Sequence, residues 1–374
     1  MQLDRIEAAI AAMARGELVV VVDDTDRENE GDLIMSASKA TPETMAFMIR
    51  HTSGIICVPM TAERADRLNL PPMVANNLDP MRTAFTVSVD YKVGMTTGIS
   101  AEERSNTARA LANDNAQAGD FLRPGHIFPL IARGGGVLTR SGHTEAGVDL
   151  ARLAGLDPVA VLAEVVNDDG TVKRLPQLVE FAREHGLAIV SIEDLIAYRV
   201  RTESFVTRAV TREMTIAGLK AKVHAYTTPF DPLQHIVAVF GEVGGGEDVF
   251  CRIHREQPAV DLFGRGGRGG WVEAAVGAIR DKAEGRGILM VLRNPVADEL
   301  FDLASDEGDG DRKDGEKHGS ALARMQRWRE VGVGAQILRN LGVDSIALLA
   351  SADRQYVGLG GFGIEITRTV KLDC

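Results

Sequence analysis

Short apolar runs alternate with amphipathic segments through the first part of the chain. Apolar side chains recur at helical spacing over residues 6–13, Gly16 ends that segment, and an uninterrupted apolar run follows at 18–22. A second apolar run at 159–166 leads through a turn to the amphipathic stretch 176–185. Helices that alternate with buried strands predict an α/β or α+β domain.

The pattern changes near residue 205, where an alternating, β-branched stretch begins. Because a chain of 374 residues is long for one domain, we expect two, spanning 1–204 and 205–374. Within the second, the Gly-Arg stretch 264–270 and the charged, Gly-rich stretch 305–319 have too few apolar residues to pack. We expect both stretches to be loops.

The composition excludes several classes of protein. A net charge of −11 at pH 7 predicts no nucleic-acid partner, because a polyanion would meet a repulsive field. No apolar run approaches the roughly 18 residues of a membrane span, and the N-terminus carries acidic residues where a signal peptide needs positive charge. The three cysteines are too few and too scattered for a disulfide framework or a four-thiolate metal site. We therefore expect a cytoplasmic protein without a membrane partner.

An acidic segment directly follows the first apolar run. Residues 23–32 read Asp-Asp-Thr-Asp-Arg-Glu-Asn-Glu-Gly-Asp and carry six carboxylates. Ligand sites in open α/β sheets lie beyond such strand ends. The segment is either a solvated acidic loop or a metal site, because crowded carboxylates repel one another unless a cation offsets them. A hard divalent cation with oxygen ligands would do so, and magnesium is the obvious candidate.

A second polar segment, Arg-Ser-Gly-His-Thr-Glu at 140–145, precedes a predicted helix at 146–153. Backbone N–H groups at a helix start, two hydroxyls and an arginine fork can together satisfy a phosphate monoester. The same residues are equally compatible with an ordinary capping turn. His143 within it is then either a surface cap residue or a metal ligand.

Two further side chains are candidates for proton transfer. His126 lies between Pro124 and Pro129, which restrict the backbone on both sides. It is either a positioned acid or base, or a histidine satisfied in a tight turn. Glu164 is the one acid within the apolar run 159–166, so it either has a structural partner or a raised pKa and a role as a base.

Taken in order, these segments resemble 3,4-dihydroxy-2-butanone 4-phosphate synthase of riboflavin biosynthesis. The resemblance covers nearly all of residues 1–200, and several ordered motifs over that length make a chance match negligible. The motifs are Asp26-Arg-Glu-Asn-Glu-Gly-Asp32, His51-Thr-Ser-Gly-Ile-Ile-Cys57, Phe85-Thr-Val, Thr96-Thr-Gly-Ile-Ser-Ala-Glu-Glu-Arg104, Arg123-Pro-Gly-His126, Arg140-Ser-Gly-His-Thr-Glu145 and Asn167-Asp-Asp-Gly170.

The resemblance implies a lyase that converts D-ribulose 5-phosphate into L-3,4-dihydroxy-2-butanone 4-phosphate and formate, with the former C4 leaving as formate. It implies that Glu28 and His143 hold the metal, Mg²⁺ or Mn²⁺ with two ions per active site, and that His126 and Glu164 are the acid–base pair. It also implies an α+β homodimer with the active site near the subunit interface. The implied substrate-binding residues are Arg27, Glu28, Asp32, Arg140, Ser141, Gly142, His143, Thr144 and Glu164.

This chemistry explains the residue types. Loss of a proton next to the carbonyl of a ketopentose phosphate builds negative charge on oxygen, which a divalent cation stabilises. Loss of water, rearrangement of the carbon skeleton and loss of formate then need proton donors and acceptors at several stages. We expect the acidic segment, including Glu30, to cover the substrate and keep water from a reactive dicarbonyl intermediate.

From about residue 205 the chain resembles GTP cyclohydrolase II, most clearly at 334–343 and 356–363. That family needs zinc on three cysteines to generate its hydrolytic nucleophile. Here Gln257 takes the first cysteine position, and the stretch 265–270, where the other two belong, has none. Cys251 lies elsewhere and cannot replace three ligands. We therefore expect no zinc.

Other departures point the same way. The phosphate-binding stretch of the cyclohydrolase reads Asn-Pro-Val-Ala-Asp at 294–298, and Arg327 stands in place of the catalytic aspartate, although Arg329 matches the family's arginine. The apolar pattern at 337–343 and a strand at 345–350 persist. We expect a second α/β domain that folds without cyclohydrolase activity and serves assembly, stability or regulation. The alternatives are a bifunctional enzyme with a zinc-free route and a non-enzymatic assembly subunit.

Overall fold

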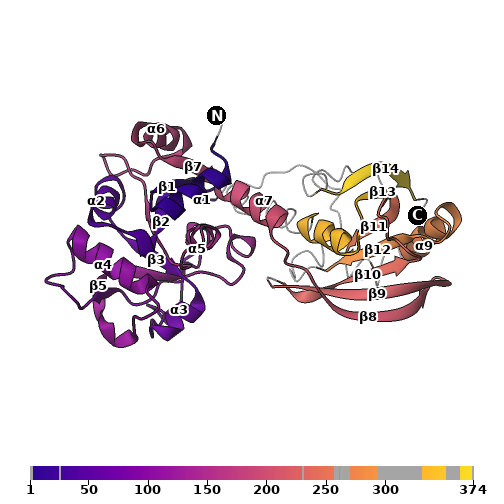
Figure 1. The fold of residues 1–374 in the computed structure, drawn as a ribbon, viewed down its shortest axis with the longest axis horizontal. Coiled ribbons are helices and arrows are strands. Elements are labelled where there is room, and N and C mark those ends of the chain that lie inside the picture. Colours follow the sequence, from indigo (N-terminus) through magenta and orange to yellow (C-terminus); the bar gives the residue numbers. More distant parts are fainter. Residues whose placement is uncertain are drawn as a thin grey trace, which may run out of the picture. The chain divides into compact units, whose positions relative to one another are not determined.

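The computed structural model describes residues 3–24, 27–229, 231–256, 261, 270–293, 331–350 and 363–372. The chain divides into two compact units, the first ending at Tyr198 and the second beginning at Arg199. Each unit has its own sheet, with helices packed against it (Figure 1). The predicted architecture of two successive domains that mix helices and strands is confirmed.

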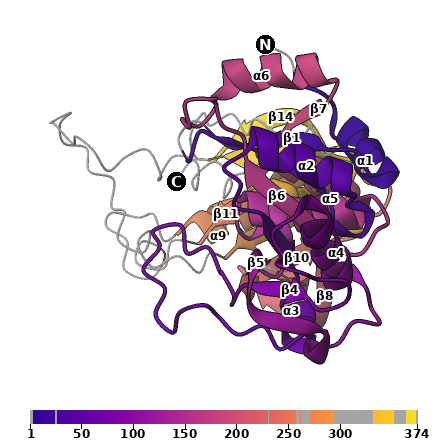
Figure 2. The same cartoon turned by 90° about the vertical axis from the view of Figure 1, so that its left-hand side faces the viewer.

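The first unit contains a mixed seven-stranded sheet in the order β4-β5-β3-β6-β2-β1-β7. β1 pairs antiparallel with β2 and parallel with β7, while β3 pairs parallel with β5 and antiparallel with β6. Figure 2 shows β1 and β7 toward one end of the unit and β4 and β5 toward the other. The strands are β1 (Val19–Val22), β2 (Gly31–Ser36), β3 (Cys57–Met60), β4 (Val89–Tyr91), β5 (Phe121–Ile131), β6 (Ala160–Glu164) and β7 (Ala188–Ser191).

Helices cover this sheet and bury one apolar core. The core includes Val20, Leu33 and Val161 of the central strands. Helical segments of this unit are α1 (Ile6–Arg15), η1 (Ala37–Lys39), α2 (Pro42–His51), α3 (Ala62–Arg67), α4 (Ala101–Ala112), η2 (Ala118–Asp120), η3 (Gly136–Leu138), α5 (His143–Leu153), α6 (Leu175–His185) and α7 (Ile192–Thr202), the last of which contains the division between the units.

The predicted elements of the first unit match the observed ones closely. Gly16 closes α1 in the left-handed conformation, with φ of 84°. The run at 18–22 forms β1, whose four valines are all buried, and the amphipathic stretch at 176–185 forms α6. Helix α5 begins at His143, three residues before the predicted start, because Gly142 is its N-cap.

The second unit contains another mixed sheet, in the order β14-β13-β11-β12-β10-β9-β8. The alternating stretch after residue 205 forms β8, and the predicted strand at 345–350 is confirmed as β13. Its elements are β8 (Thr207–Ile216), β9 (Leu219–Thr228), β10 (Asp231–Phe240), β11 (Val249–Arg255), α9 (Trp271–Lys282), β12 (Gly287–Leu292), β13 (Ser345–Ala350) and β14 (Glu365–Lys371).

A second apolar core supports this unit. Phe240, Ile279 and Leu289 belong to it, and helical residues 331–340 bury Ile337 and Leu338. The predicted loop 305–319 and all but the last residue of the predicted loop 264–270 lie outside the described residues. Across the part of the chain that is described, no helix combines the length and the apolar character needed to cross a membrane.

Candidate active site

Asp23 organises the acidic segment that links β1 to β2. Its carboxylate accepts hydrogen bonds from the backbone N–H groups of Glu28 (3.0 Å) and Glu30 (2.9 Å). The chain thereby turns back into β2, where Asp32 pairs across the sheet with Glu164 of β6. Two predicted site regions that are far apart in the sequence therefore meet at one end of the sheet.

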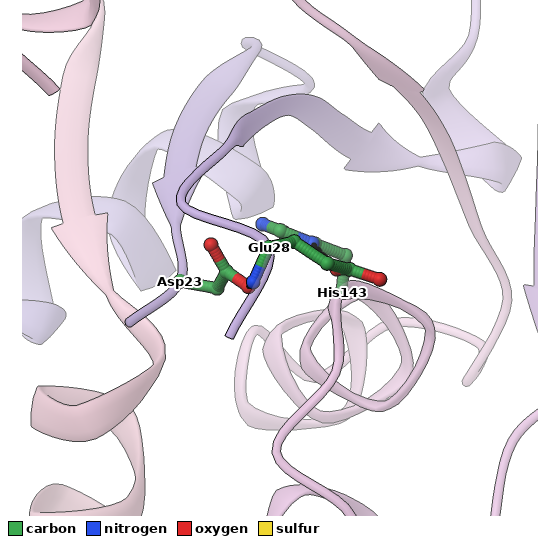
Figure 3. A group of neighbouring side chains, drawn as sticks. All are labelled: Asp23, Glu28 and His143. Atoms are coloured by element: carbon green, nitrogen blue, oxygen red, sulfur yellow. Dashed lines mark hydrogen bonds and ion pairs between the residues drawn. The ribbon is translucent and has the colours of Figure 1, made fainter. Parts of the chain in front are cut away.

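Helix α5 brings His143 against this segment (Figure 3). Nδ1 of His143 lies 3.6 Å from Glu28 Oε2 and 3.9 Å from Asp32 Oδ1, and Nε2 lies 3.1 Å from the carbonyl oxygen of Val21. One ligand atom from each of Asp23, Glu28 and His143 lies within 4.8 Å of the other two. The alternative of a surface cap residue is wrong for His143, because its side chain is buried.

Burial and mutual charge set the protonation of these groups. Burial raises the pKa of Asp32 to about 7, and nearby carboxylates add to this while His143 opposes it. Burial acts to lower the pKa of His143, but the Asp32 charge and the contact with Glu28 raise it to about 9. Burial acts to raise the pKa of Glu28, yet His143 and Arg27 lower it to about 2. The protonation of each group therefore depends on its neighbours, and His143 must release a proton before its imidazole can hold a metal ion.

The donor set fits a divalent cation. Carboxylates suit hard cations such as Mg²⁺ and Mn²⁺, and an imidazole can complete the set. Oδ1 of Asp32 is buried and has no hydrogen-bond partner among the described atoms, so a cation or its bound water would satisfy it. The solvated-loop alternative is disfavoured, because none of the described residues of the acidic segment is fully exposed.

The start of α5 has the features of an anion site. Its N-cap is Gly142, which gives the first backbone N–H groups no side-chain cap, so the capping-turn alternative is not realised. A Cβ on Gly142 would lie 2.3 Å from Arg140 Nη1, so only glycine permits this close approach. Glu145 holds Arg140 through a 2.6 Å ion pair, and the carbonyl oxygen of Met81 accepts from Arg140 Nη2 at 3.1 Å. The guanidinium is therefore fixed beside the helix start.

One cavity of about 140 Å³ extends from Glu28 and His143 to the start of α5. Seven of the predicted site residues line it, whereas Ser141, Gly142 and His126 are not among the lining residues. The complete lining is Arg27, Glu28, Glu30, Asp32, Cys57, Thr83, Phe85, Leu130, Arg140, His143, Thr144, Leu162 and Glu164.

Glu164 has a structural partner and faces the cavity as well. Ser53 Oγ donates a 2.7 Å hydrogen bond to its Oε2, and the backbone N–H of Ser53 bonds to its carbonyl oxygen at 2.9 Å. The two alternatives for Glu164, a paired carboxylate and a base, therefore do not exclude each other. Ser53 orients the carboxylate in the cavity wall.

His126 lies in strand β5, so the alternative of a tight turn is wrong. Its side chain is 42% exposed, and Nδ1 lies 2.7 Å from Asp90 Oδ2. Leu130 of the same strand lines the cavity, and four residues of strand separate the two by roughly 13 Å. His126 is therefore not part of the cavity wall of its own chain.

Sequence reasoning missed several of the residues that complete the site. Asp23 is the first residue of the acidic segment, and its place directly after the apolar run 18–22 is the one feature of the sequence that indicates a role for it. Thr83 and Phe85 come from the irregular stretch between α3 and β4, where periodicity offers no guidance; Phe85 begins one of the motifs, but no role was assigned to it. Asp90 is one charged residue in a short strand, and only the fold brings it to His126.

The second unit shows part of the region where a cyclohydrolase centre would lie. Nε2 of His254 lies 3.0 Å from both carboxylate oxygens of Asp261, and its ring stacks on Trp271 with 3.9 Å between centroids. Cys251 is buried, and burial raises the pKa of its thiol to about 12. The predictions for several cyclohydrolase positions lie outside the described residues, namely those for Gln257, 265–269, 294–298, Arg327, Arg329 and 356–362.

Comparison with known proteins agrees with this division of the chain. The family model of 3,4-dihydroxy-2-butanone 4-phosphate synthase matches residues 7–198, and that of GTP cyclohydrolase II matches residues 207–371. Riboflavin biosynthesis protein RibBA of Nocardia farcinica is 45% identical over 386 residues, which cover 99% of this chain and 91% of that protein. Monofunctional riboflavin biosynthesis protein RIBA 2, chloroplastic, of Arabidopsis thaliana is also 45% identical, over 98% of this chain and 76% of its own length.

Solved structures give the same result. RibBX of A. baumannii, a two-domain 3,4-dihydroxy-2-butanone 4-phosphate synthase, matches with a TM-score of 0.75 and 37% identity over 98% of this chain and 100% of its own. A synthase in complex with two magnesium ions matches with a TM-score of 0.52 and 50% identity over 54% of this chain and 98% of its own. The chain therefore belongs to the 3,4-dihydroxy-2-butanone 4-phosphate synthase family, and a GTP cyclohydrolase II-like domain follows its synthase domain.

Proposed function

We propose that the cavity of the first unit converts D-ribulose 5-phosphate into L-3,4-dihydroxy-2-butanone 4-phosphate and formate. One observation carries this proposal: a carboxylate–imidazole cluster, an uncapped helix start and a strand-end carboxylate line a single cavity. A phosphorylated ketose that loses a proton next to its carbonyl needs a site for each of these groups.

Glu28 and His143 would hold the divalent cation, Mg²⁺ or Mn²⁺. Two ions per site are proposed because a solved synthase that shares 50% identity with this chain is in complex with two magnesium ions. When bound, the metal would stabilise negative charge on the substrate oxygens. Asp23 would act through the loop instead, because both of its oxygens accept backbone N–H groups and its Oδ2 also pairs with Arg27 at 3.0 Å.

The phosphate of the substrate is placed at the start of α5. The residues that would bind it are Arg140, Ser141, Gly142, His143 and Thr144. Uncapped N–H groups and the positive end of the helix dipole favour an anion there. Arg27 and Asp32 also line the cavity and would contact the sugar. Glu30 lies beside them and would help to keep water out.

Glu164 is the proposed base for the proton next to the substrate carbonyl. Its carboxylate lines the cavity and is oriented by Ser53 at 2.7 Å. The later steps need a second proton carrier, and His126 is the proposed one. Since His126 does not line its own cavity and its side chain is exposed, we propose that it acts in the cavity of a second copy.

A homodimer follows from that requirement. Exposed apolar side chains neighbour the residues that contact His126: Leu122, at 40% exposure, pairs with Asp90, and Ile99, at 52%, follows Gly98, while Val93, at 66%, follows β4. Leu78, at 83% exposure, adds to them from the stretch that leads to the cavity residue Thr83. Such apolar side chains near an incomplete site suit a subunit interface.

Product analysis tests the proposed reaction. Purified full-length protein is incubated with uniformly ¹³C-labelled ribulose 5-phosphate and Mg²⁺, and the products are followed by ¹³C NMR. Formate and the four-carbon phosphate are expected with Mg²⁺ and not with EDTA, and Glu28→Gln is expected to behave like the EDTA sample. Unchanged substrate with the wild-type protein and metal would contradict the proposal and favour the non-enzymatic subunit.

The second domain, proposed to span 205–374 after a synthase domain of 1–204, is expected to lack cyclohydrolase activity and zinc. The missing cysteines support this, and the thiol of Cys251 is buried in a β-strand. The names of relatives such as bifunctional RIBA 1 of Arabidopsis thaliana, 45% identical, favour the alternative of a bifunctional enzyme. Zinc analysis and GTP turnover by the purified protein separate the two, because the alternative requires turnover.

A cytoplasmic location is also proposed. Cys57 and Cys251 are both free and buried, as expected in a reducing compartment. Fractionation of the source cells with an antibody against the protein tests this, and recovery from an oxidising compartment would contradict it.

A further inference from the structure

The pairing of β4 with β5 is interrupted beside His126. Asp90 pairs with Leu122 and Val89 with Ile127, so the ladder passes over residues 123–126 of β5. A β-bulge of this kind re-aims the side chains within it. The interruption therefore gives His126 an orientation that a regular strand would not.

The Asp90 side chain takes over the hydrogen bonds of the interrupted ladder. Its Oδ1 accepts from the backbone N–H of His126 at 2.9 Å, and its Oδ2 lies 2.7 Å from Nδ1 of the same residue. Asp90 is 3% exposed, so this carboxylate is taken out of water to make the two contacts. Because an ionised carboxylate only accepts, Nδ1 must carry a proton and Nε2 must be the ring's acceptor.

The surroundings are built closely around this pair. Gly98 has φ of +83°, and a Cβ there would lie 2.2 Å from Asp90 Oδ2 and 2.9 Å from His126 Nδ1. Arg104 is buried nearby; burial lowers the pKa of its guanidinium, and the Asp90 charge acts in the opposite direction. A buried carboxylate with a cation beside it remains a strong acceptor.

We propose that Asp90 is a positioning residue for the synthase reaction: it fixes the tautomer and orientation of His126, so that Nε2 accepts a proton from the substrate and later returns it. The inference rests on the role of His126 in the proposed function. The imidazolium that forms when Nε2 takes the proton is stabilised by the adjacent carboxylate. The same division of roles between a carboxylate and a histidine operates in hydrolase triads.

The two hydrogen bonds make the expected effect of Asp90→Asn specific. The His126 backbone N–H is an obligatory donor, so the Asn oxygen must face it and the Asn NH₂ group must face Nδ1. Nδ1 then accepts and the proton moves to Nε2, which is the wrong tautomer for a base. We expect kcat to fall by about 10²- to 10⁴-fold with little change in KM.

Three measurements on the full-length protein test this. Steady-state kinetics compare Asp90→Asn with His126→Ala and with the double variant. ¹⁵N NMR of protein labelled only in its eight histidines reports which ring nitrogen of His126 is protonated, with His126→Ala identifying the signals. Asp149→Asn is the matched control for folding, because Asp149 is also buried, at 1% exposure, and accepts the backbone N–H of Val137.

We expect Asp90→Asn to lose most of its kcat, and its NMR spectrum to show His126 protonated at Nε2. Adding Asp90→Asn to His126→Ala should cause no further loss of kcat. The melting temperature of Asp90→Asn should be close to that of Asp149→Asn. Near-wild-type kcat in Asp90→Asn, or a further loss in the double variant, would overturn the inference. If His126→Ala itself retained activity, the proposed role of His126 would fail. An inactive His126→Ala variant together with an active Asp90→Asn variant would instead refute only the role proposed for Asp90.

Discussion

Dimers that carry two different inactivating substitutions test whether each active site is shared between chains. His126→Ala removes the proposed proton carrier and Glu164→Gln removes the proposed base, so each homodimer is expected to lose at least ~10²-fold in kcat. His126 is not among the residues that line the cavity of its own chain, and its side chain is 42% exposed. A chain should therefore not be able to use its own His126.

The expected activity follows from counting intact sites. In a dimer of one His126→Ala chain and one Glu164→Gln chain, the cavity of the first chain has Glu164 and receives His126 from the second. The other cavity lacks both, so heterodimers purified through two affinity tags should have about half of the wild-type activity. An unpurified equal mixture after subunit exchange should reach about a quarter.

A matched heterodimer gives the opposite result. When both substitutions are on one chain and the partner chain is wild type, each cavity lacks one group, and no activity is expected. If each site instead used its own chain's His126, this dimer would be half active and the mixed dimer inactive. That reversed pattern would refute the proposal that His126 acts in the cavity of the partner chain.

Three further predictions concern single residues. Gly98→Ala should lower kcat at least ~10-fold and destabilise the fold. Gly94 also has a positive φ, but among the described residues nothing beyond its chain neighbours would lie within 4 Å of a Cβ added there. Gly94→Ala should therefore reduce the free energy of unfolding, measured with urea, by only about 1 kcal/mol and leave kcat unchanged. Hydrogen bonds from the residues before α4 lower the pKa of Glu103 to about 2 from its ordinary 4.5. A carboxyl group whose pKa is lower in the folded state stabilises the fold at pH values above its unfolded-state pKa. Glu103→Gln should therefore reduce the melting temperature at pH 7 relative to Glu102→Gln. This difference in melting temperature should disappear as the pH falls from 4.5 toward 2. Ser53→Ala should lower kcat about 10-fold, since a hydrogen bond to a charged group is worth ~1.5 kcal/mol; equal kcat would show that the carboxylate needs no such support.

Local periodicity was sufficient to predict a helix or strand wherever one face of that element is buried. Helix α1, strand β1 and helix α6 each occupy the residues that their apolar spacing predicts, because burial of that face determines both the spacing and the element. The same reasoning located β13 in the second unit. The motif residues of the acidic segment and of the α5 start could also be placed at strand and helix ends before the fold was known.

Features that depend on tertiary pairing could not be predicted. The run with two prolines around His126 indicates a turn, because proline is rare in strand interiors, yet the interrupted β4–β5 ladder accommodates it within a strand. The sequence does not distinguish Asp23 from the other acids of its segment, because its role depends on the backbone N–H groups that it binds. Phe85 reaches the cavity from a stretch without regular structure, where no repeating pattern guides a prediction.

The fate of a single labelled carbon tests the central claim most directly. Ribulose 5-phosphate labelled with ¹³C at C4 alone is incubated with the full-length protein and Mg²⁺, and the label is followed by ¹³C NMR. All of the label is expected in formate and none in the four-carbon phosphate. Label retained in a phosphorylated product, or substrate that stays unchanged with metal present, would contradict the claim that this cavity carries out the synthase reaction.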